Sequence, residues 1–235
     1  MSLHRDKQDD LYRIFGVGLN KTGTTTLRRC FNILGLGPVA PGGSRETKKC
    51  TRYILKYHNY NLALRVAAKY RCFEDRPWNL WEMYKKADQG FPGSKFILTV
   101  RESEKWWRSV ERWLIFSKPR ILNKYCHQFN IKNIPSIEAK SMEIQQLSSQ
   151  HENEPETEMM KKIISPLKEQ MIAEYEKYNR MVIDYFSGRD NLFIVNFEKS
   201  CGWQPLCHFL SQPIPTVSLT HENRQYYDER DLKVS

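Results

Sequence analysis

A short polar loop near the start of the chain carries the residue types that bind phosphate-like anions. Residues 13–19 (RIFGVGL) are mostly apolar, and residues 20–26 follow as a loop of small polar side chains. Gly18 and Gly23 let backbone N–H groups turn toward a ligand, and the amphipathic segment after the loop predicts a helix. The amino terminus of that helix adds partial positive charge, so we expect an anion to bind here.

The loop is close to the Walker A pattern of nucleotide triphosphatases but lacks the Walker lysine. Thr24 occupies the lysine position, and the only lysine of the loop is Lys21, three residues earlier. The apolar run FILTV ends in Arg101, where many triphosphatases have an aspartate that helps to hold Mg²⁺. A cation at this place suits a phosphate group and not a metal ion, which makes a P-loop nucleotide kinase the weaker alternative.

A second anion site is predicted at Arg101 and Ser109. Arg101 follows an apolar strand, where parallel-sheet folds open their ligand crevice, and Ser109 lies nearly two turns into the helix that follows. A guanidinium fork and a hydroxyl group together make a good phosphate clamp.

These two motifs resemble those of the sulfotransferases that use 3′-phosphoadenosine 5′-phosphosulfate (PAPS). The run NKTGTT at residues 20–25 resembles their 5′-phosphosulfate loop, and Arg101 with Ser109 resembles their 3′-phosphate motif at the same spacing. Residues 202–210 (GWQPLCHFL) are similar to the G-W-E-P-L-C-x-F-L segment of one branch, with Gln204 in place of the glutamate.

The resemblance implies a metal-independent transfer of a sulfuryl group from PAPS to an acceptor hydroxyl or amine. Lys21 would contact the bridging oxygen and the sulfuryl group, Thr24 and Thr25 the 5′-phosphate, and Arg101 and Ser109 the 3′-phosphate. The residues expected to bind the donor are Asn20, Lys21, Thr22, Gly23, Thr24, Thr25, Arg101 and Ser109.

An attacking hydroxyl group must lose its proton, so a base is expected near the sulfuryl group. Asp75 follows a short apolar run and resembles the D-x-P carboxylate of this branch, and Glu74 is the alternative. Lys21 and Asp75 are therefore the candidate catalytic residues. Trp78 and Trp81 come just after Asp75, and either an aromatic acceptor wall or core packing fits their position.

Strands and helices are expected to alternate along the chain, which predicts an α/β fold. More narrowly, we expect a P-loop-type three-layer fold with a mainly parallel central sheet flanked by helices. The expected strands are 13–19, 70–73, 95–100 and 192–196. The expected helices are 27–34, 60–69, 80–86, 103–116 with Ser103 as N-cap, 165–185 and 203–210, and residues 36–50 are expected to form a loop. We expect one sulfotransferase domain over 1–235, with an inserted cap or loop at 117–156.

Composition and charge limit the functional classes to which the protein could belong. The chain has no apolar run long enough to span a bilayer, and its six cysteines are scattered without a C-x-x-C pair, which predicts reduced thiols, a cytoplasmic location and no metal site. The net charge of +10 allows an anionic substrate or nucleic acid, but the cations are dispersed, so a nucleic-acid-binding module is the less favoured reading. The expected partners are PAPS and an unidentified acceptor, either a small molecule or a glycan.

Overall fold

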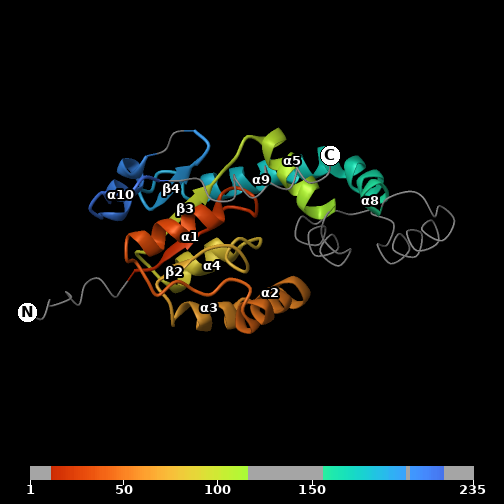
Figure 1. The fold of residues 1–235 in the computed structure, drawn as a ribbon. Coiled ribbons are helices and arrows are strands. Elements are labelled where there is room, and N and C mark those ends of the chain that lie inside the picture. Colours follow the sequence, from red (N-terminus) through yellow and green to blue (C-terminus); the bar gives the residue numbers. More distant parts are fainter. Residues whose placement is uncertain (1–11, 116–155, 200–201, 220–235) are drawn as a thin grey trace, which may run out of the picture. The chain divides into compact units, whose positions relative to one another are not determined.

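The computed structural model of the protein describes residues 12–115, 156–199 and 202–219 (Figure 1). The chain divides into two compact units. The first unit is formed by the chain up to Arg101 and from Asn179 onward, and the second by Glu102–Tyr178. All four strands belong to the first unit.

The sheet is parallel throughout and has the strand order β2-β1-β3-β4. Its strands are β1 (Ile14–Gly16), β2 (Cys72–Phe73), β3 (Lys95–Thr99) and β4 (Leu192–Val195). The register pairs Phe15 with Phe73 and Phe96, and Ile97 with Phe193. Each predicted strand is present and is one to four residues shorter than expected. Because all strands are parallel, their carboxyl ends share one edge of the sheet, and loops from that edge can form a single site.

One face of the sheet packs against α1 (Thr24–Ile33) and α10 (Trp203–Leu210). Ile14, Cys72 and Ile97 point to this face and join one buried cluster with apolar side chains of both helices. Side chains alternate along a strand, so the neighbouring residues must point to the opposite face.

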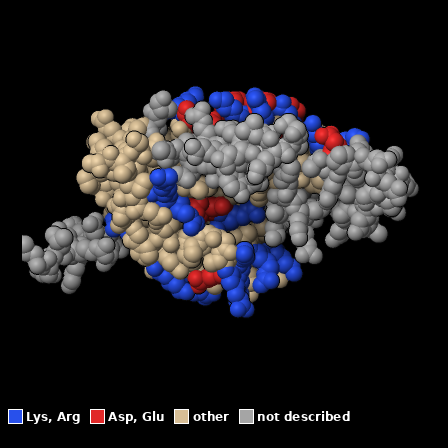
Figure 2. All heavy atoms as spheres, viewed as in Figure 1, with Lys and Arg blue, Asp and Glu red and all other residues tan. Residues whose placement is uncertain are grey.

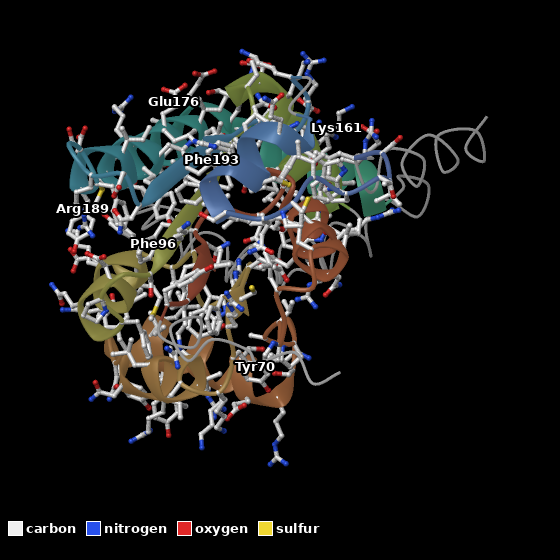
Figure 3. All side chains as sticks on the ribbon, turned by 90° about the vertical axis from the view of Figure 1, so that its left-hand side faces the viewer. Tyr70, Phe96, Lys161, Glu176, Arg189 and Phe193 are labelled. Atoms are coloured by element: carbon white, nitrogen blue, oxygen red, sulfur yellow. The ribbon has the colours of Figure 1, made fainter. Side chains whose placement is uncertain are left out.

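The opposite face is aromatic. The Phe15 ring lies 4.5 Å from the Phe73 ring and 5.4 Å from the Phe96 ring, and Phe186, just after α9 (Lys168–Tyr185), packs on Phe96 at 4.6 Å. Near this layer, Arg189 pairs with Asp88 of α4 (Met83–Gly90); Phe96 and Arg189 are labelled in Figure 3. Helices on both faces of a parallel sheet confirm the predicted three-layer α/β architecture.

A helical hairpin replaces part of the loop expected at residues 36–50. The hairpin consists of α2 (Arg45–Tyr57) and α3 (Asn61–Ala67). The loop prediction is wrong from residue 45 onward, because the Ser44 side chain caps α2 by accepting a hydrogen bond from the Thr47 N–H group at 3.2 Å. The polar composition that favoured a loop belongs to the exposed side of this helix.

The second unit contains α5 (Ser103–Ile115), α8 (Glu156–Ile164), the 3₁₀ turn η1 (Ser165–Leu167) and the first part of α9. Trp106 stacks on Tyr175 with 4.3 Å between ring centroids. The prediction of Ser103 as N-cap is wrong by one residue: the Glu102 carboxylate accepts the N–H groups of residues 104 and 105, while the Ser103 hydroxyl donates to Glu176 (labelled in Figure 3).

The insertion expected at residues 117–156 lies almost entirely outside the described residues. None of the helices described here is both long and apolar enough to cross a membrane.

Candidate active site

The phosphate loop joins β1 to α1, and packing fixes both of its glycines. A Cβ atom on Gly18 would lie 2.0 Å from the Thr99 hydroxyl oxygen, so no larger residue fits against β3. Gly23 has a φ of 104°, and a Cβ there would lie 2.8 Å from the Phe197 ring. The two glycines that the sequence singled out are therefore required by close approach at one position and by backbone conformation at the other.

Thr22 anchors the loop to the sheet. Its side chain is buried, donates to the Leu19 carbonyl oxygen at 2.5 Å and lies 2.6 Å from the Thr99 hydroxyl group. Because the Thr22 hydroxyl is already hydrogen-bonded within the protein, the group of Thr22 expected to contact the donor is its backbone N–H. Thr24 is also buried, whereas Thr25 is exposed.

The amino terminus of α1 has the electrostatic character of an anion site. Gly23 is its N-cap, no side chain caps it, and its first turn contains no acidic residue. No carboxylate of the helix itself therefore competes with a bound anion for its first N–H groups. The positive end of the helix dipole also favours an anion there. Lys21, half-buried, lies in the loop just before this end.

Asp75 is held directly against the phosphate loop. Its Oδ1 atom accepts hydrogen bonds from the Asn20 side-chain amide and, at 2.7 Å, from the Arg76 N–H group. Within the described part of the chain, no donor reaches its Oδ2 atom, and the residue is only partly buried. The structure therefore brings the predicted base next to Asn20, the residue that precedes Lys21, although Asn20 and Asp75 lie 55 positions apart in the sequence.

Lys21 and Asp75 share an unusual backbone conformation. Their φ angles are 71° and 62°, in the left-handed region that few non-glycine residues adopt. Such strain persists where surrounding contacts impose it, and it clusters at functional sites. The conformation of both candidate catalytic residues is therefore consistent with a built site at this sheet edge.

Glu74 lies beside the site but faces away from solvent. It is 4% exposed and forms an ion pair with Arg28 of α1. Burial and the neighbouring Asp75 carboxylate raise the pKa of Glu74 to about 7, against the opposing effect of the Arg28 guanidinium. Because Glu74 is buried and paired with Arg28, Asp75 is the better placed of the two candidate bases to accept a proton from an acceptor.

Arg101 is at the same sheet edge, after β3. Its guanidinium pairs with the carboxylate of Glu198, which follows β4. Ser109 lies on α5, in the second unit. The joint role of Arg101 and Ser109 at a 3′-phosphate stays a prediction.

The two tryptophans after Asp75 have different environments. Trp78 is 1% exposed and packs against Phe73 at 4.4 Å, so it belongs to the core and not to an acceptor wall. Trp81 is partly exposed and stacks on His58, with 4.7 Å between ring centroids.

Three contributors to the site were not singled out from the sequence: Arg28, Thr99 and Glu198. Glu198 follows an apolar strand, so the rule that drew attention to Arg101 and Asp75 also points to it. Arg28 and Thr99 act through contacts between distant segments and leave no local signal.

The chain matches the family model of a sulfotransferase domain over residues 13–226. It belongs to the sulfotransferase family. The match covers the phosphate loop, Asp75 and the α10 segment, and it confirms the family resemblance found in the motifs. Family membership assigns the protein to sulfuryl transfer in general, with a sulfate donor and an acceptor as its substrates. A search of curated proteins gives no match.

In this protein, the G-W-Q-P segment begins α10, and this helix packs against the sheet. Leu206, Cys207 and Leu210 are buried against the sheet, and the Trp203 indole donates to the Val217 carbonyl oxygen at 2.6 Å. Gln204 is exposed on the outer side of the helix.

Proposed function

We propose that this protein transfers the sulfuryl group of PAPS to an acceptor hydroxyl or amine, and releases 3′-phosphoadenosine 5′-phosphate (PAP). The observation that carries the proposal is the hydrogen bond from Asn20 to Asp75, which links the phosphate loop to a partly exposed carboxylate. An anion loop and a proton acceptor at one sheet edge supply what direct transfer to a nucleophile needs.

The donor binds along the carboxyl edge of the sheet. The loop N–H groups and the start of α1 hold the 5′-phosphosulfate, with Lys21 and Thr25 beside it. Arg101 takes the 3′-phosphate after exchanging its pairing with Glu198 for the ligand. Exchange of one anionic partner for another keeps the guanidinium satisfied, because a phosphate offers the same paired acceptors as a carboxylate.

The reaction is a single displacement at sulfur. The acceptor oxygen forms a bond to sulfur while the bond from sulfur to the 5′-phosphate oxygen breaks. The acceptor proton passes to Oδ2 of Asp75, and Lys21 stabilises the charge that grows on the leaving phosphate. Asn20 orients the carboxylate by binding its other oxygen.

The location of the enzyme is proposed from its cysteines. Three that the structure describes, Cys50, Cys72 and Cys207, are free thiols and are buried. Unpaired thiols support a reducing compartment, and hence the cytoplasm.

Ligand-dependent melting in EDTA tests the donor. PAP at a hundredfold excess over its Kd should stabilise the protein by about 2.7 kcal/mol without added metal. Strong stabilisation by Mg-ATP and none by PAP would instead support a nucleotide kinase. Incubation with ³⁵S-labelled PAPS and a panel of hydroxyl and amine acceptors then tests transfer itself.

A further inference from the structure

The α2–α3 hairpin has a strongly basic surface outside the candidate active site. Residues 45–69 contain seven lysines and arginines and one acidic residue. That residue, Glu46, pairs with Lys69 at 2.7 Å. The lower part of Figure 2 shows cations gathered over these two helices. A surface dominated by one sign of charge attracts ligands of the opposite sign.

A pocket lies in the groove of this hairpin. It has a volume of about 330 Å³ and is lined by Lys49, Tyr53, Asn59, Asn61, Leu62 and Arg65. In the described chain, neither Lys49 nor Arg65 forms an ion pair with a carboxylate; the Lys49 ammonium group lies over the Tyr53 ring at 5.8 Å. The pocket is at the lower end of the size range of ligand sites, which suits one small polar unit and not a large apolar molecule.

The lining groups match an acidic sugar. Two cations can bind a carboxylate, while side-chain amides donate and accept hydrogen bonds, as vicinal hydroxyl groups require. The Asn59 side-chain Oδ1 atom accepts the Asn61 N–H group at 3.0 Å, which fixes the turn, and the exposed Asn61 lines the pocket. Tyr53 and Leu62 offer apolar surface to the C–H face of a sugar ring.

The hairpin is also connected to the candidate active site at both ends of α2. A Cβ atom on Gly42, just before α2, would lie 2.4 Å from the Arg28 guanidinium and 3.3 Å from Glu74. At the other end, His58 stacks on Trp81, six residues after Asp75. Gly42 and His58, which flank the helix that lines the pocket, thus lie against Glu74 and Trp81, on either side of Asp75 in the sequence.

We propose that the α2–α3 pocket binds a carboxylated sugar unit, and that the acceptor of the reaction is an acidic oligosaccharide. The second half of this proposal rests on the proposed function. The first half is a binding site that stands without it.

Binding of a labelled galacturonate hexamer, measured by fluorescence anisotropy at low salt and without PAPS, tests the pocket. The wild-type protein should bind this probe and should not bind neutral maltohexaose. The double variant Lys49→Gln/Arg65→Gln should weaken binding about tenfold or more, as expected for the loss of two charge-assisted contacts. Asn61→Ala keeps the charge and should weaken binding severalfold.

The matched control is Arg45→Gln/Lys48→Gln, which removes the same charge from α2 at exposed residues that do not line the pocket. It should weaken binding less than threefold, by long-range attraction alone. An equal loss in both double variants would overturn the proposal in favour of diffuse charge. Tighter binding of single-stranded DNA or of anionic vesicles than of the hexamer, unchanged by Asn61→Ala, would also overturn it.

PAP binding separates this proposal from the proposed function. Both double variants should keep wild-type PAP affinity, which also shows that they are folded. With ³⁵S-labelled PAPS, the pocket variant should raise the KM for the hexamer and leave kcat nearly unchanged. Hexamer binding without PAP binding would refute the proposed function and support the pocket as a binding site. PAP binding without hexamer binding would refute the pocket proposal and support the proposed function.

Discussion

Replacement of Asp75 by asparagine is the sharpest perturbation of the proposed chemistry. Asp75 accepts the Asn20 amide and the Arg76 N–H group through Oδ1. An asparagine carbonyl oxygen can accept both of these hydrogen bonds, and its NH₂ group then occupies the position of Oδ2. The shape of the site is retained, whereas the proton acceptor is removed.

The expected effect on turnover follows from this exchange. Loss of a positioned general base lowers the rate by roughly 10²–10⁴-fold, which corresponds to about 3–5 kcal/mol in the activation free energy. Stability should change by about 1 kcal/mol or less, because both hydrogen bonds persist, although they no longer involve a charged acceptor. PAP affinity should stay within about twofold, since no role in donor binding is assigned to this carboxylate.

Single-turnover transfer from ³⁵S-labelled PAPS, measured by rapid quench beside a PAP titration, gives both quantities. Glu74→Gln is the control, because Glu74 is buried against Arg28. Near-normal transfer in Asp75→Asn together with a collapse in Glu74→Gln would refute the assignment and move the base one residue upstream.

Three further predictions address the surrounding residues. Lys21→Ala should lower kcat much more than it lowers PAPS affinity, because its charge is needed most when the leaving phosphate develops charge; pre-steady-state kinetics separates the two. Arg101→Ala should weaken PAP binding by about 1.5–3 kcal/mol and leave the affinity for adenosine 5′-phosphosulfate nearly unchanged, whereas Glu198→Gln should tighten PAP binding a few-fold because it removes the competing carboxylate. Calorimetry with both nucleotides measures these affinities. Equal losses for the two ligands in Arg101→Ala would contradict the 3′-phosphate role. Burial raises the pKa of Glu74 from 4.5 to about 7, so the folded state holds a proton that the unfolded state releases, and the free energy of unfolding should fall by about 3 kcal/mol as pH rises from 4.5 to 7. Denaturant unfolding of Glu74→Gln should show a flatter pH profile over that range. A profile equal to that of the wild type would contradict the raised pKa of Glu74.

The sheet was readable from the sequence because its strands are short apolar runs that end in polar residues. RIFGVGL and KFILTV are mostly apolar, as buried strands are, and the helices expected between the strands predict the parallel order. Residues 45–50 were misread for the opposite reason. Their polar composition is that of a loop, and only the Ser44 cap, with three buried residues on the inner side of α2, shows the helix.

The site was partly readable for a similar reason. Strand ends identified Lys21, Asp75 and Arg101 separately, because parallel strands place their carboxyl ends together. No local pattern indicates that Asn20 donates a hydrogen bond to Asp75, that the Thr22 hydroxyl contacts Thr99, or that Arg101 pairs with Glu198. These are contacts between side chains of different strands' loops, and they depend on orientation that no local pattern encodes.

The two tryptophans near Asp75 show the same limit. Trp78 and Trp81 are equivalent in composition, yet one fills the core against Phe73 and the other stacks on His58. Spacing could not separate them, because the segment between them is irregular.

The most direct test of the central claim is the stoichiometry of transfer from PAPS in EDTA. Rapid-quench samples should contain one PAP for each ³⁵S-labelled acceptor molecule, with no labelled protein, and Lys21→Ala and Asp75→Asn should suppress both products together. Release of PAP with the label found only as inorganic sulfate over the whole acceptor panel, or label retained on the protein, would contradict direct transfer at this site.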